Sequence, residues 1–226
     1  TVSMAHRMQI GPEDRAALAF PIAHIGGVNW LMASFITGCA VIVLESFADP
    51  TTMPALRRHG VTLAGVGTAF HMAYLAAQRA NPEERLFPRV RAYPGGAAPK
   101  PPQLHYDLVA EVGGVGIVAG FGLTEYPMCG MAAVWDHTDK LAHTEGRPSD
   151  GTELIVLDEQ GERVGPNVDG EIRIRGPHLF AGYVDPQLDV DGFDEHGFFK
   201  TGDIGHLDEE GYVVITGRLK DVINRK

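Results

Sequence analysis

The chain reads Val115-Gly116-Ile117-Val118-Ala119 and continues directly as Gly120-Phe121-Gly122-Leu123-Thr124-Glu125. The first part is a short, almost unbroken apolar run, which is typical of a strand buried on both faces in a parallel sheet covered by helices. The second part places two glycines where that strand would end, and this lets a ligand approach the backbone. The stretch therefore predicts a buried parallel strand that leads into a binding turn.

The same alternation fills the chain from about residue 16 to residue 126. Short apolar runs alternate with segments that have helical spacing of apolar residues or a proline near the first turn. Five strands separated by four crossovers predict an α/β fold with a doubly wound, mostly parallel sheet and helices on both faces. The expected strands are Ala17–Phe20, Cys39–Leu44, Val61–Val66, Val90–Tyr93 and Val115–Ala119, and the expected helices are Val28–Ile36, Thr51–His59, Ala69–Arg79 and Pro101–Glu111.

The pattern changes after about residue 140. Strand-like segments with alternating or β-branched residues are separated by turn sequences such as Asp158-Glu159-Gln160-Gly161, without a helix-length periodic segment between them. This half predicts a small antiparallel, β-barrel-like subdomain. We therefore expect an α/β subdomain over residues 1–140 and the β-barrel-like subdomain over residues 141–217. The expected strands of the second subdomain are Thr152–Leu157, Glu171–Arg175 and Tyr212–Thr216.

Composition argues against several classes of protein. The 226 residues are 44% hydrophobic and 21% charged, which is typical of a globular chain and excludes wholesale disorder. A net charge of −10 argues against sequence-independent binding to nucleic acid or to an anionic membrane, because both favour basic surfaces. Two cysteines cannot form a disulfide framework, so we expect a reducing, cytoplasmic compartment. The most apolar stretch, residues 28–44, is broken by polar residues and predicts a buried helix and strand rather than a membrane span.

Glycine-containing loops follow four of the five expected strands. Ligands of open parallel sheets bind beyond the carboxyl ends of the strands, so these loops would share one rim. Turns between strands and helices often need glycine for steric reasons alone, and that alternative stays open for each loop taken singly. The loops are His24-Ile25-Gly26-Gly27, Gly65-Val66-Gly67-Thr68, Pro94-Gly95-Gly96-Ala97-Ala98-Pro99 and Gly120-Phe121-Gly122-Leu123-Thr124-Glu125.

The last of these loops carries the side chains with the clearest chemistry. Phe121 offers a flat apolar face, Thr124 a hydroxyl suited to a phosphate oxygen, and Glu125 a hard carboxylate suited to Mg²⁺. The alternatives are a core position for Phe121 and an ordinary helix start at Thr124, which is itself compatible with a phosphate at the helix N-terminus.

The sequence Gly-Phe-Gly-Leu-Thr-Glu resembles the [YF]-G-x-T-E motif of the adenylate-forming superfamily, which comprises acyl-CoA synthetases, firefly luciferases and adenylation domains of peptide synthetases. Further stretches resemble the family's other motifs in the family's order, from about residue 18 to the end of the chain. They are Phe20–Gly27 (L-P-x-x-H), Gly95–Ala98 (G-G-A), Gly170–Gly176 with Ala181-Gly182-Tyr183, Lys200–Asp203 (T-G-D), and Gly217–Asp221 (G-R-x-K-[DE]).

The resemblance implies a function and its cofactors. Members of the family join a carboxylate to ATP as an acyl-adenylate, release pyrophosphate, and pass the acyl group to a thiol, usually that of coenzyme A. We therefore expect a carboxylic acid:CoA ligase that uses ATP, Mg²⁺ and coenzyme A. Two alternatives stay open: an adenylation enzyme that loads a carrier protein, and a non-catalytic module that binds AMP or an acyl-adenylate.

The resemblance assigns one group of residues to the adenylate. Phe121 is expected to stack on adenine, with the Gly95 loop against the other side of the ring. Asp203 would accept hydrogen bonds from both ribose hydroxyls, and Arg218 would add a charged donor nearby. From the residues alone, the alternative that Asp203 only braces the turn beside Gly202 stays open. The implied cofactor-binding residues are Gly95, Gly96, Ala97, Phe121, Gly122, Thr124, Asp203 and Arg218.

Another group is implied in catalysis and acyl binding. Thr124 would contact the α-phosphate, Glu125 would hold Mg²⁺, and His24 would stand near the substrate carboxylate. Without the resemblance, His24 reads better as a satisfied core histidine, and Trp30 could face either the pocket or the core. The expected acyl pocket, which is largely apolar and suits a fatty, alicyclic or aromatic acid, contains His24, Trp30, Gly120 and Met128.

The resemblance also implies parts that flank this sequence. A phosphate-gripping loop rich in Ser, Thr and Gly would precede it, and a C-terminal domain with a catalytic lysine would follow it. Lys220 falls at the family's hinge position, so residues 218–226 would be the hinge segment towards that domain. We therefore expect this chain to be a central fragment that binds an adenylate but is catalytically incomplete.

Overall fold

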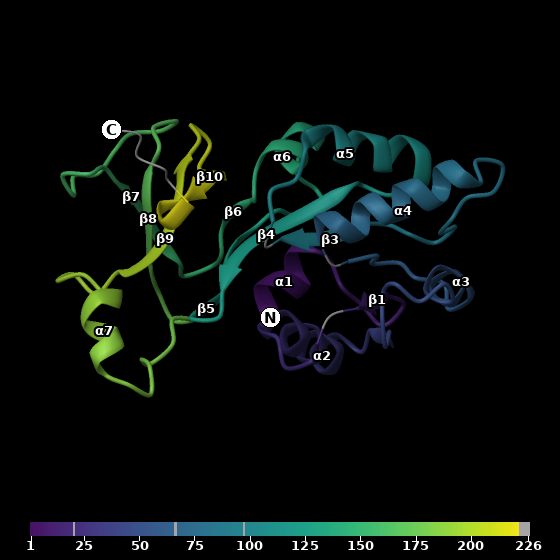
Figure 1. The fold of residues 1–226 in the computed structure, drawn as a ribbon, viewed down its shortest axis with the longest axis horizontal. Helices are drawn as coiled ribbons and strands as arrows, with labels where there is room; N and C mark the ends of the chain where they lie inside the picture. Colours follow the sequence, from purple (N-terminus) through teal and green to yellow (C-terminus); the bar gives the residue numbers. More distant parts are fainter. Residues whose placement is uncertain (20, 66, 97, 222–226) are drawn as a thin grey trace.

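The structure is a computed structural model that describes residues 1–19, 21–65, 67–96 and 98–221. It contains an α/β part and a β-rich part, which lie on opposite sides of Figure 1. Phe20, Val66, Ala97 and residues 222–226 lie outside the described residues, so the ends of two expected strands and most of the expected hinge segment do as well.

A parallel sheet forms the centre of the α/β part. Strands β1 (Arg15–Leu18) and β2 (Ala40–Val43) pair in parallel, as do β3 (Tyr93–Gly96) and β4 (Ile117–Leu123). Leu63 joins the two pairs through single parallel bridges to Ala16 and Ala92. The order across the sheet is therefore β2, β1, Leu63, β3 and β4, which confirms the predicted mostly parallel arrangement.

The far edge of this sheet is antiparallel, and here the structure corrects two expectations. Strand β5 (Tyr126–Met131) turns back along β4, with Leu123 paired to Tyr126, and β6 (Arg147–Pro148) pairs with β5. Gly120–Leu123 are thus part of a strand rather than a loop, and Thr124 and Glu125 form the tight turn of a hairpin rather than a helix start. The apolar run at 126–131 completes the sheet as a strand, so it leaves no residues for a helix.

Helices cover both faces of the sheet, as predicted. Figure 1 shows α4 (Thr68–Ala80), α5 (Pro102–Asp107) and α6 (Thr138–His143) on one side of β3 and β4, and α1 (Val2–Arg7) and α2 (Ile25–Thr37) on the other. Helix α3 (Thr52–Arg58) follows β2, and a π-helical turn (Leu108–Val112) extends α5. The short helices α1 and α6 were not expected from the sequence.

Two buried clusters fix these helices on the sheet. Tyr74 of α4 is fully buried with Phe87 and Leu108 on one face, and its hydroxyl donates to the carbonyl of Gly65 at 2.7 Å. Trp30 of α2 packs with Met8 and Val118 on the other face. Burial of such large side chains contributes about 1.5–3 kcal/mol each, so the cores on the two faces hold the ends of β3 and β4 in place.

The β-rich part is an open antiparallel sheet. Its strands are β7 (Glu153–Leu157), β8 (Gly170–Arg175), β9 (Phe199–Leu207) and β10 (Val213–Arg218), in the order β10-β9-β8-β7. Strands β7 and β10 occupy opposite edges, so the described strands do not close the expected barrel. A short helix α7 (Gln187–Gly192) and a 3-10 turn (Leu219–Asp221) complete this part.

A third core joins the two parts. Phe121 and Cys129 from the β4–β5 hairpin pack with Ile172, Phe199 and Val213 from the β-rich sheet. The expected boundary near residue 140 stays a prediction, because β6 at residues 147–148 still pairs with the first sheet. The junction places the β4–β5 hairpin against strands β8, β9 and β10.

Candidate functional site

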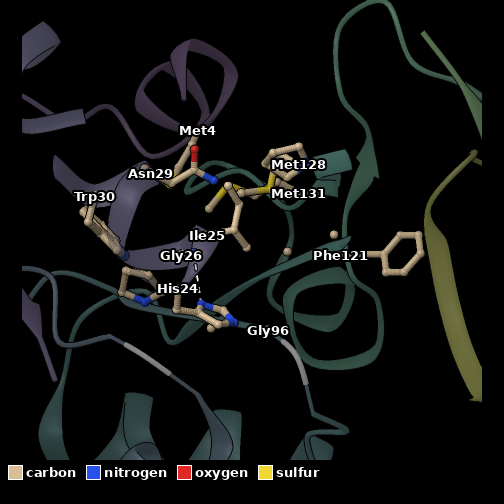
Figure 2. Close-up of a pocket in the computed structure, with 15 residues that line it drawn as sticks. Met4, His24, Ile25, Gly26, Asn29, Trp30, Gly96, Phe121, Met128 and Met131 are labelled. Atoms are coloured by element: carbon tan, nitrogen blue, oxygen red, sulfur yellow. Dashed lines mark hydrogen bonds between the residues drawn. The ribbon is translucent and has the colours of Figure 1, made fainter. Parts of the chain in front are cut away.

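A cavity of about 150 Å³ lies where the carboxyl ends of β3 and β4 meet the start of α2. In Figure 2, side chains from α2 stand on one side of it and the methionines of β5 on the other. The lining includes every residue predicted for the acyl pocket, together with four of those predicted for the adenylate. These residues are His24, Trp30, Gly120 and Met128, and Gly95, Gly96, Phe121 and Gly122.

Close packing of the two strands explains the glycines on this rim. Gly96 is paired with Gly120, and a Cβ atom at Gly96 would lie 2.4 Å from the Gly120 carbonyl oxygen. The two backbones approach more closely than any larger residue allows. The steric alternative therefore accounts for Gly96, while the same glycines leave the cavity wall as bare backbone.

His24 stands exposed at the mouth of the cavity and begins α2. Its Nδ1 accepts a hydrogen bond from the backbone N–H of Gly26 at 3.0 Å, so the side chain caps the helix. A neutral ring that accepts at Nδ1 carries its proton on Nε2. The exposure rules out the core-histidine alternative, and the role near a substrate carboxylate stays a prediction.

Trp30 and Asn29 form the inner wall. Trp30 is buried in the core cluster and also lines the cavity, so it faces both the core and the pocket. Asn29 is the other polar side chain, besides His24, among the described lining residues, and its Oδ1 accepts a hydrogen bond from the Thr1 hydroxyl at 2.9 Å. The described lining contains no Asp, Glu, Lys or Arg, so the cavity is suited to an apolar group.

Phe121 is among the residues that line the cavity, but its ring points away from it. Side chains alternate along a strand, so Phe121 leaves β4 on the face opposite to Gly120 and Gly122. Figure 2 shows its ring directed away from the other labelled side chains, and it is buried in the core that joins the two parts of the molecule. The core-aromatic alternative describes this placement, and stacking on adenine stays a prediction.

Glu125 is held by the segment that follows β8. The Tyr183 hydroxyl donates to Glu125 Oε1 at 2.6 Å, and the backbone N–H of Phe180 donates to the Glu125 carbonyl at 2.8 Å. The bond to the carboxylate raises the pKa of Tyr183 to about 12, so the phenol remains a donor at neutral pH. Thr124 is exposed beside it on the same turn.

Asp203 and Arg218 come together on neighbouring strands. They are register partners of β9 and β10, and Arg218 Nε donates to Asp203 Oδ1 at 2.9 Å. Burial raises the pKa of Asp203, and the Arg218 guanidinium opposes that rise. Burial, followed by the Asp203 carboxylate, also raises the pKa of the Cys129 thiol, so Asp203 lies near the core that contains Phe121. Asp203 is not among the described residues that line the cavity.

The other two predicted residues are Ala97 and Lys220. Ala97 is outside the described residues. Lys220 is exposed in the 3-10 turn after β10, at the end of the described chain. Tyr183, by contrast, had no predicted role although its Ala-Gly-Tyr motif was recognised, because nothing in the sequence indicates that residue 183 reaches residue 125.

The carboxylate of Glu125 is compatible with a magnesium ion that is also bound by phosphate oxygens. The described residues contain no cluster of three or more His, Cys, Asp or Glu that could hold a metal by themselves. Mg²⁺ at nucleotide sites needs only one or two protein carboxylates, with phosphate oxygens and water as the other ligands. One carboxylate oxygen of Glu125 is used by Tyr183, so the single carboxylate fits such an ion through its other oxygen.

Sequence comparison identifies relatives of known activity. The sequence model of the family described as AMP-binding enzyme matches residues 1–184. The medium-chain fatty-acid–CoA ligase of Escherichia coli is 28% identical over 221 residues, which cover 97% of this chain and 38% of that protein. The salicyl-AMP ligase / salicyl-S-ArCP synthetase of Mycobacterium tuberculosis is 31% identical over 209 residues, which cover 91% of this chain and 35% of that protein.

Structure comparison agrees with the sequence. The O-succinylbenzoate coenzyme A synthetase of Bacillus subtilis, solved with ATP and a magnesium ion, superposes with a TM-score of 0.84 at 27% identity. The match covers 98% of this chain and 45% of that one. The chain thus spans less than half of the length of each of these proteins. No described helix combines the length and the apolar character that crossing a bilayer would require.

Proposed function

The chain belongs to the AMP-binding enzyme family, and from this premise we propose that it is the central part of an ATP-dependent carboxylic acid:CoA ligase. In the longer protein, a carboxylate oxygen of the substrate attacks the α-phosphorus of ATP. The bond to the bridging oxygen breaks, pyrophosphate leaves, and an acyl-adenylate forms. The thiol of coenzyme A then attacks the acyl carbon, and AMP leaves with the electron pair of the broken bond.

The observation that carries this proposal is the convergence of distant residues on one cavity. The cavity is lined together by residues that are up to about a hundred positions apart: His24 at the N-cap of α2, Trp30 of α2, Gly96 of β3, Gly120 of β4 and Met128 of β5. All of them are residues that the resemblance assigns to acyl or adenylate binding. Five residues so far apart in the sequence would not be expected to meet at one cavity by chance.

The chain's own residues would divide the work of adenylation. Thr124, exposed on the β4–β5 turn, would donate its hydroxyl to the α-phosphate, and Asp203 would accept the ribose hydroxyls. Glu125 would hold Mg²⁺, which, when bound, supplies positive charge against the α-phosphate and the departing pyrophosphate. Arg218 would keep Asp203 ionised, since its guanidinium opposes the effect of burial on that carboxyl.

The cavity favours an apolar acyl group. Its lining is largely apolar and includes Ile25, Trp30, Met128 and Met131. The lining of methionine, tryptophan, proline and glycine offers no charge for an α-amino group. We therefore propose a fatty, alicyclic or aromatic acid as the substrate.

A second candidate is transfer of the acyl group to an acceptor other than coenzyme A. The relative named salicyl-AMP ligase / salicyl-S-ArCP synthetase favours keeping it. In the longer protein, thioester formation that depends on coenzyme A would separate the two candidates.

The test is acid-dependent exchange of labelled pyrophosphate into ATP by the full-length protein, with a panel of fatty, alicyclic and aromatic acids. We expect exchange with at least one of these apolar acids, and formation of its CoA thioester when coenzyme A is added. An Asp203→Ala variant should lose exchange, whereas an Arg163→Ala variant, which changes an exposed arginine of the β-rich part, should retain it. Absence of exchange with every acid would overturn the proposal.

The 226-residue chain offers a complementary test. Because positioning and preorganised charges supply most of the rate enhancement in such reactions, the chain without the rest of the protein should bind AMP weakly and turn over poorly. Pyrophosphate release by the isolated chain at the rate of the full-length protein would contradict the expected incompleteness.

A further inference from the structure

The segment from Phe180 to Tyr183 forms two hydrogen bonds with Glu125. Tyr183 donates from its phenol to the Glu125 carboxylate at 2.6 Å, and Phe180 donates from its backbone to the Glu125 carbonyl at 2.8 Å. The two bonds fix both the main chain and the side chain of a residue that stands on a tight hairpin turn. A carboxylate so placed would otherwise be free to change rotamer.

The segment from Phe180 to Tyr183 is itself held in place by contacts with α7 and within the segment. The backbone N–H of Tyr183 donates to Asp189 Oδ1 on α7 at 3.0 Å. Gly182 is required beside it, because a Cβ atom there would lie 2.7 Å from Asp189 Oδ2 and the residue has a φ of 135°. The Tyr183 ring also packs edge-on against Phe180, with ring centroids 4.7 Å apart. The phenol is therefore presented to Glu125 by a fixed support.

We propose that Tyr183 is a positioning residue that holds Glu125 by Oε1 and so presents Oε2 to the magnesium ion of bound Mg·ATP. The inference rests on the proposed function, since it needs Glu125 to be the ligand of that ion. It adds a role for a tyrosine that reaches the site from the β-rich part of the molecule, 58 residues along the chain from Glu125.

Tyr183→Phe is the test variant, because it removes only the hydroxyl and keeps the ring that packs on Phe180. Tyr106→Phe is the matched control: Tyr106 is another tyrosine whose phenol donates to a carboxylate, that of Asp139 at 2.7 Å, and it lies on α5 outside the site. Each variant loses one hydrogen bond between a phenol and a carboxylate. A difference in metal binding between the two variants therefore depends on where that bond lies, and not on a general loss of stability.

The measurements use the full-length protein and are not limited to turnover. Binding of ATP is titrated at several Mg²⁺ concentrations by calorimetry, binding of Mn²⁺ in the presence of ATP is followed by electron paramagnetic resonance, and binding of AMP is measured without a divalent ion. We expect Tyr183→Phe to weaken metal binding by about 10- to 100-fold, as loss of a group that orients a metal ligand usually does. AMP binding without metal should be unchanged, and Tyr106→Phe should behave as the unaltered protein.

A double-mutant cycle with Glu125→Ala, which removes both the carboxylate and the acceptor of the Tyr183 hydroxyl, completes the test. If Tyr183 acts through Glu125, Tyr183→Phe adds nothing once Glu125 is replaced. Metal dependence in Tyr183→Phe equal to that of the unaltered protein, or a parallel loss of AMP binding without metal, would overturn the inference while leaving the proposed function intact. Failure of the proposed function would look different, since the unaltered protein would then show neither Mg²⁺-dependent ATP binding nor acid-dependent pyrophosphate exchange.

Discussion

Arg218 reaches across from β10 and donates from Nε to the Oδ1 atom of Asp203 on β9, at 2.9 Å. The side chain of Asp203 is only 6% exposed, whereas that of Arg218 is 68% exposed. Water therefore solvates the cation while the carboxylate depends on its partner. The pair keeps an acceptor inside the protein, which is the property that recognition of ribose hydroxyls requires.

Replacing Arg218 with methionine should make stability more dependent on pH. Burial already holds the pKa of Asp203 above its ordinary value, and loss of the guanidinium raises it further. A carboxyl whose folded-state pKa is raised contributes its full stability below the unfolded pKa and loses it as the pH rises through the folded value. We expect R218M to lower the free energy of unfolding by about 1 kcal/mol at pH 7 and by less at pH 4. The expected loss at pH 7 is modest because water screens the charge of the exposed Arg218 side chain.

Urea unfolding of the chain at the two pH values measures this difference. The Asp203→Asn, Arg218→Met double variant serves as the control, because it no longer has a titrating group at position 203. A loss that is equal at pH 7 and pH 4 would contradict the assigned role of the pair.

Glu125→Gln should separate catalysis from nucleotide affinity. Glutamine keeps an oxygen that can accept the Tyr183 hydroxyl but removes the negative charge that Mg²⁺ needs. In the full-length protein we expect turnover to fall by about 10²- to 10³-fold, as when one preorganised charged or polar contact to a transition state is lost. AMP affinity without metal should change little. Pyrophosphate release and AMP binding give the two readouts, and an unchanged rate would reject Glu125 as the metal ligand.

The order of strands and helices in the α/β part could be predicted because its elements are strongly periodic. Residues 28–36 and 69–79, for example, lie inside α2 and α4. The ends of β3 and β4 could not be placed, since Gly95 and Gly96 resemble loop residues locally and become a strand only because Gly120 lies directly opposite. The β4–β5 hairpin was missed for a similar reason, as an apolar run is compatible with a helix or a strand until its neighbours are known.

The grouping of the candidate site residues could be predicted where their motifs indicate it, and not where it depends on tertiary contacts, while their roles stay predictions. The four acyl-pocket residues line one cavity, and Asp203 meets Arg218 as expected. The nine-residue strand β9 was missed because Thr201-Gly202-Asp203 has the composition of a turn. The contact between Tyr183 and Glu125 was missed because no local rule relates residues 58 positions apart.

Stability should fall on mild acidification because of His71. This side chain is buried behind β3, with Nε2 3.2 Å from the Pro94 carbonyl and no partner for Nδ1 among the described residues. Burial lowers the pKa of His71 to about 4. A histidine with a depressed folded-state pKa contributes stability above its unfolded value, near 6.5, and loses it as the pH falls towards the folded value.

Between pH 7.5 and pH 5 the expected loss from His71 is about 2 kcal/mol. The urea midpoint of the chain across this range is the measurement. His71→Leu should remove this part of the pH dependence of the free energy of unfolding. His105, whose pKa burial also lowers to about 4, still contributes to the pH dependence of the variant. An identical slope in the unaltered chain and in His71→Leu would contradict the prediction.

Gly96→Ala should be costly, because the contact that it creates is with backbone. Its Cβ would lie 2.4 Å from the Gly120 carbonyl oxygen, and neither strand can shift without disturbing the pairing of β3 with β4. We expect a loss of about 1–3 kcal/mol in the free energy of unfolding, as for overpacked cores, together with weaker AMP binding, because the same two residues line the cavity. Gly165→Ala is the matched control, since a Cβ atom there meets nothing within 4 Å and surface changes of this kind usually stay within about 0.5 kcal/mol. Urea unfolding and AMP titration of both variants decide the matter: a Gly96→Ala chain as stable as the Gly165→Ala chain would mean that β3 and β4 do not approach as closely as the structure shows.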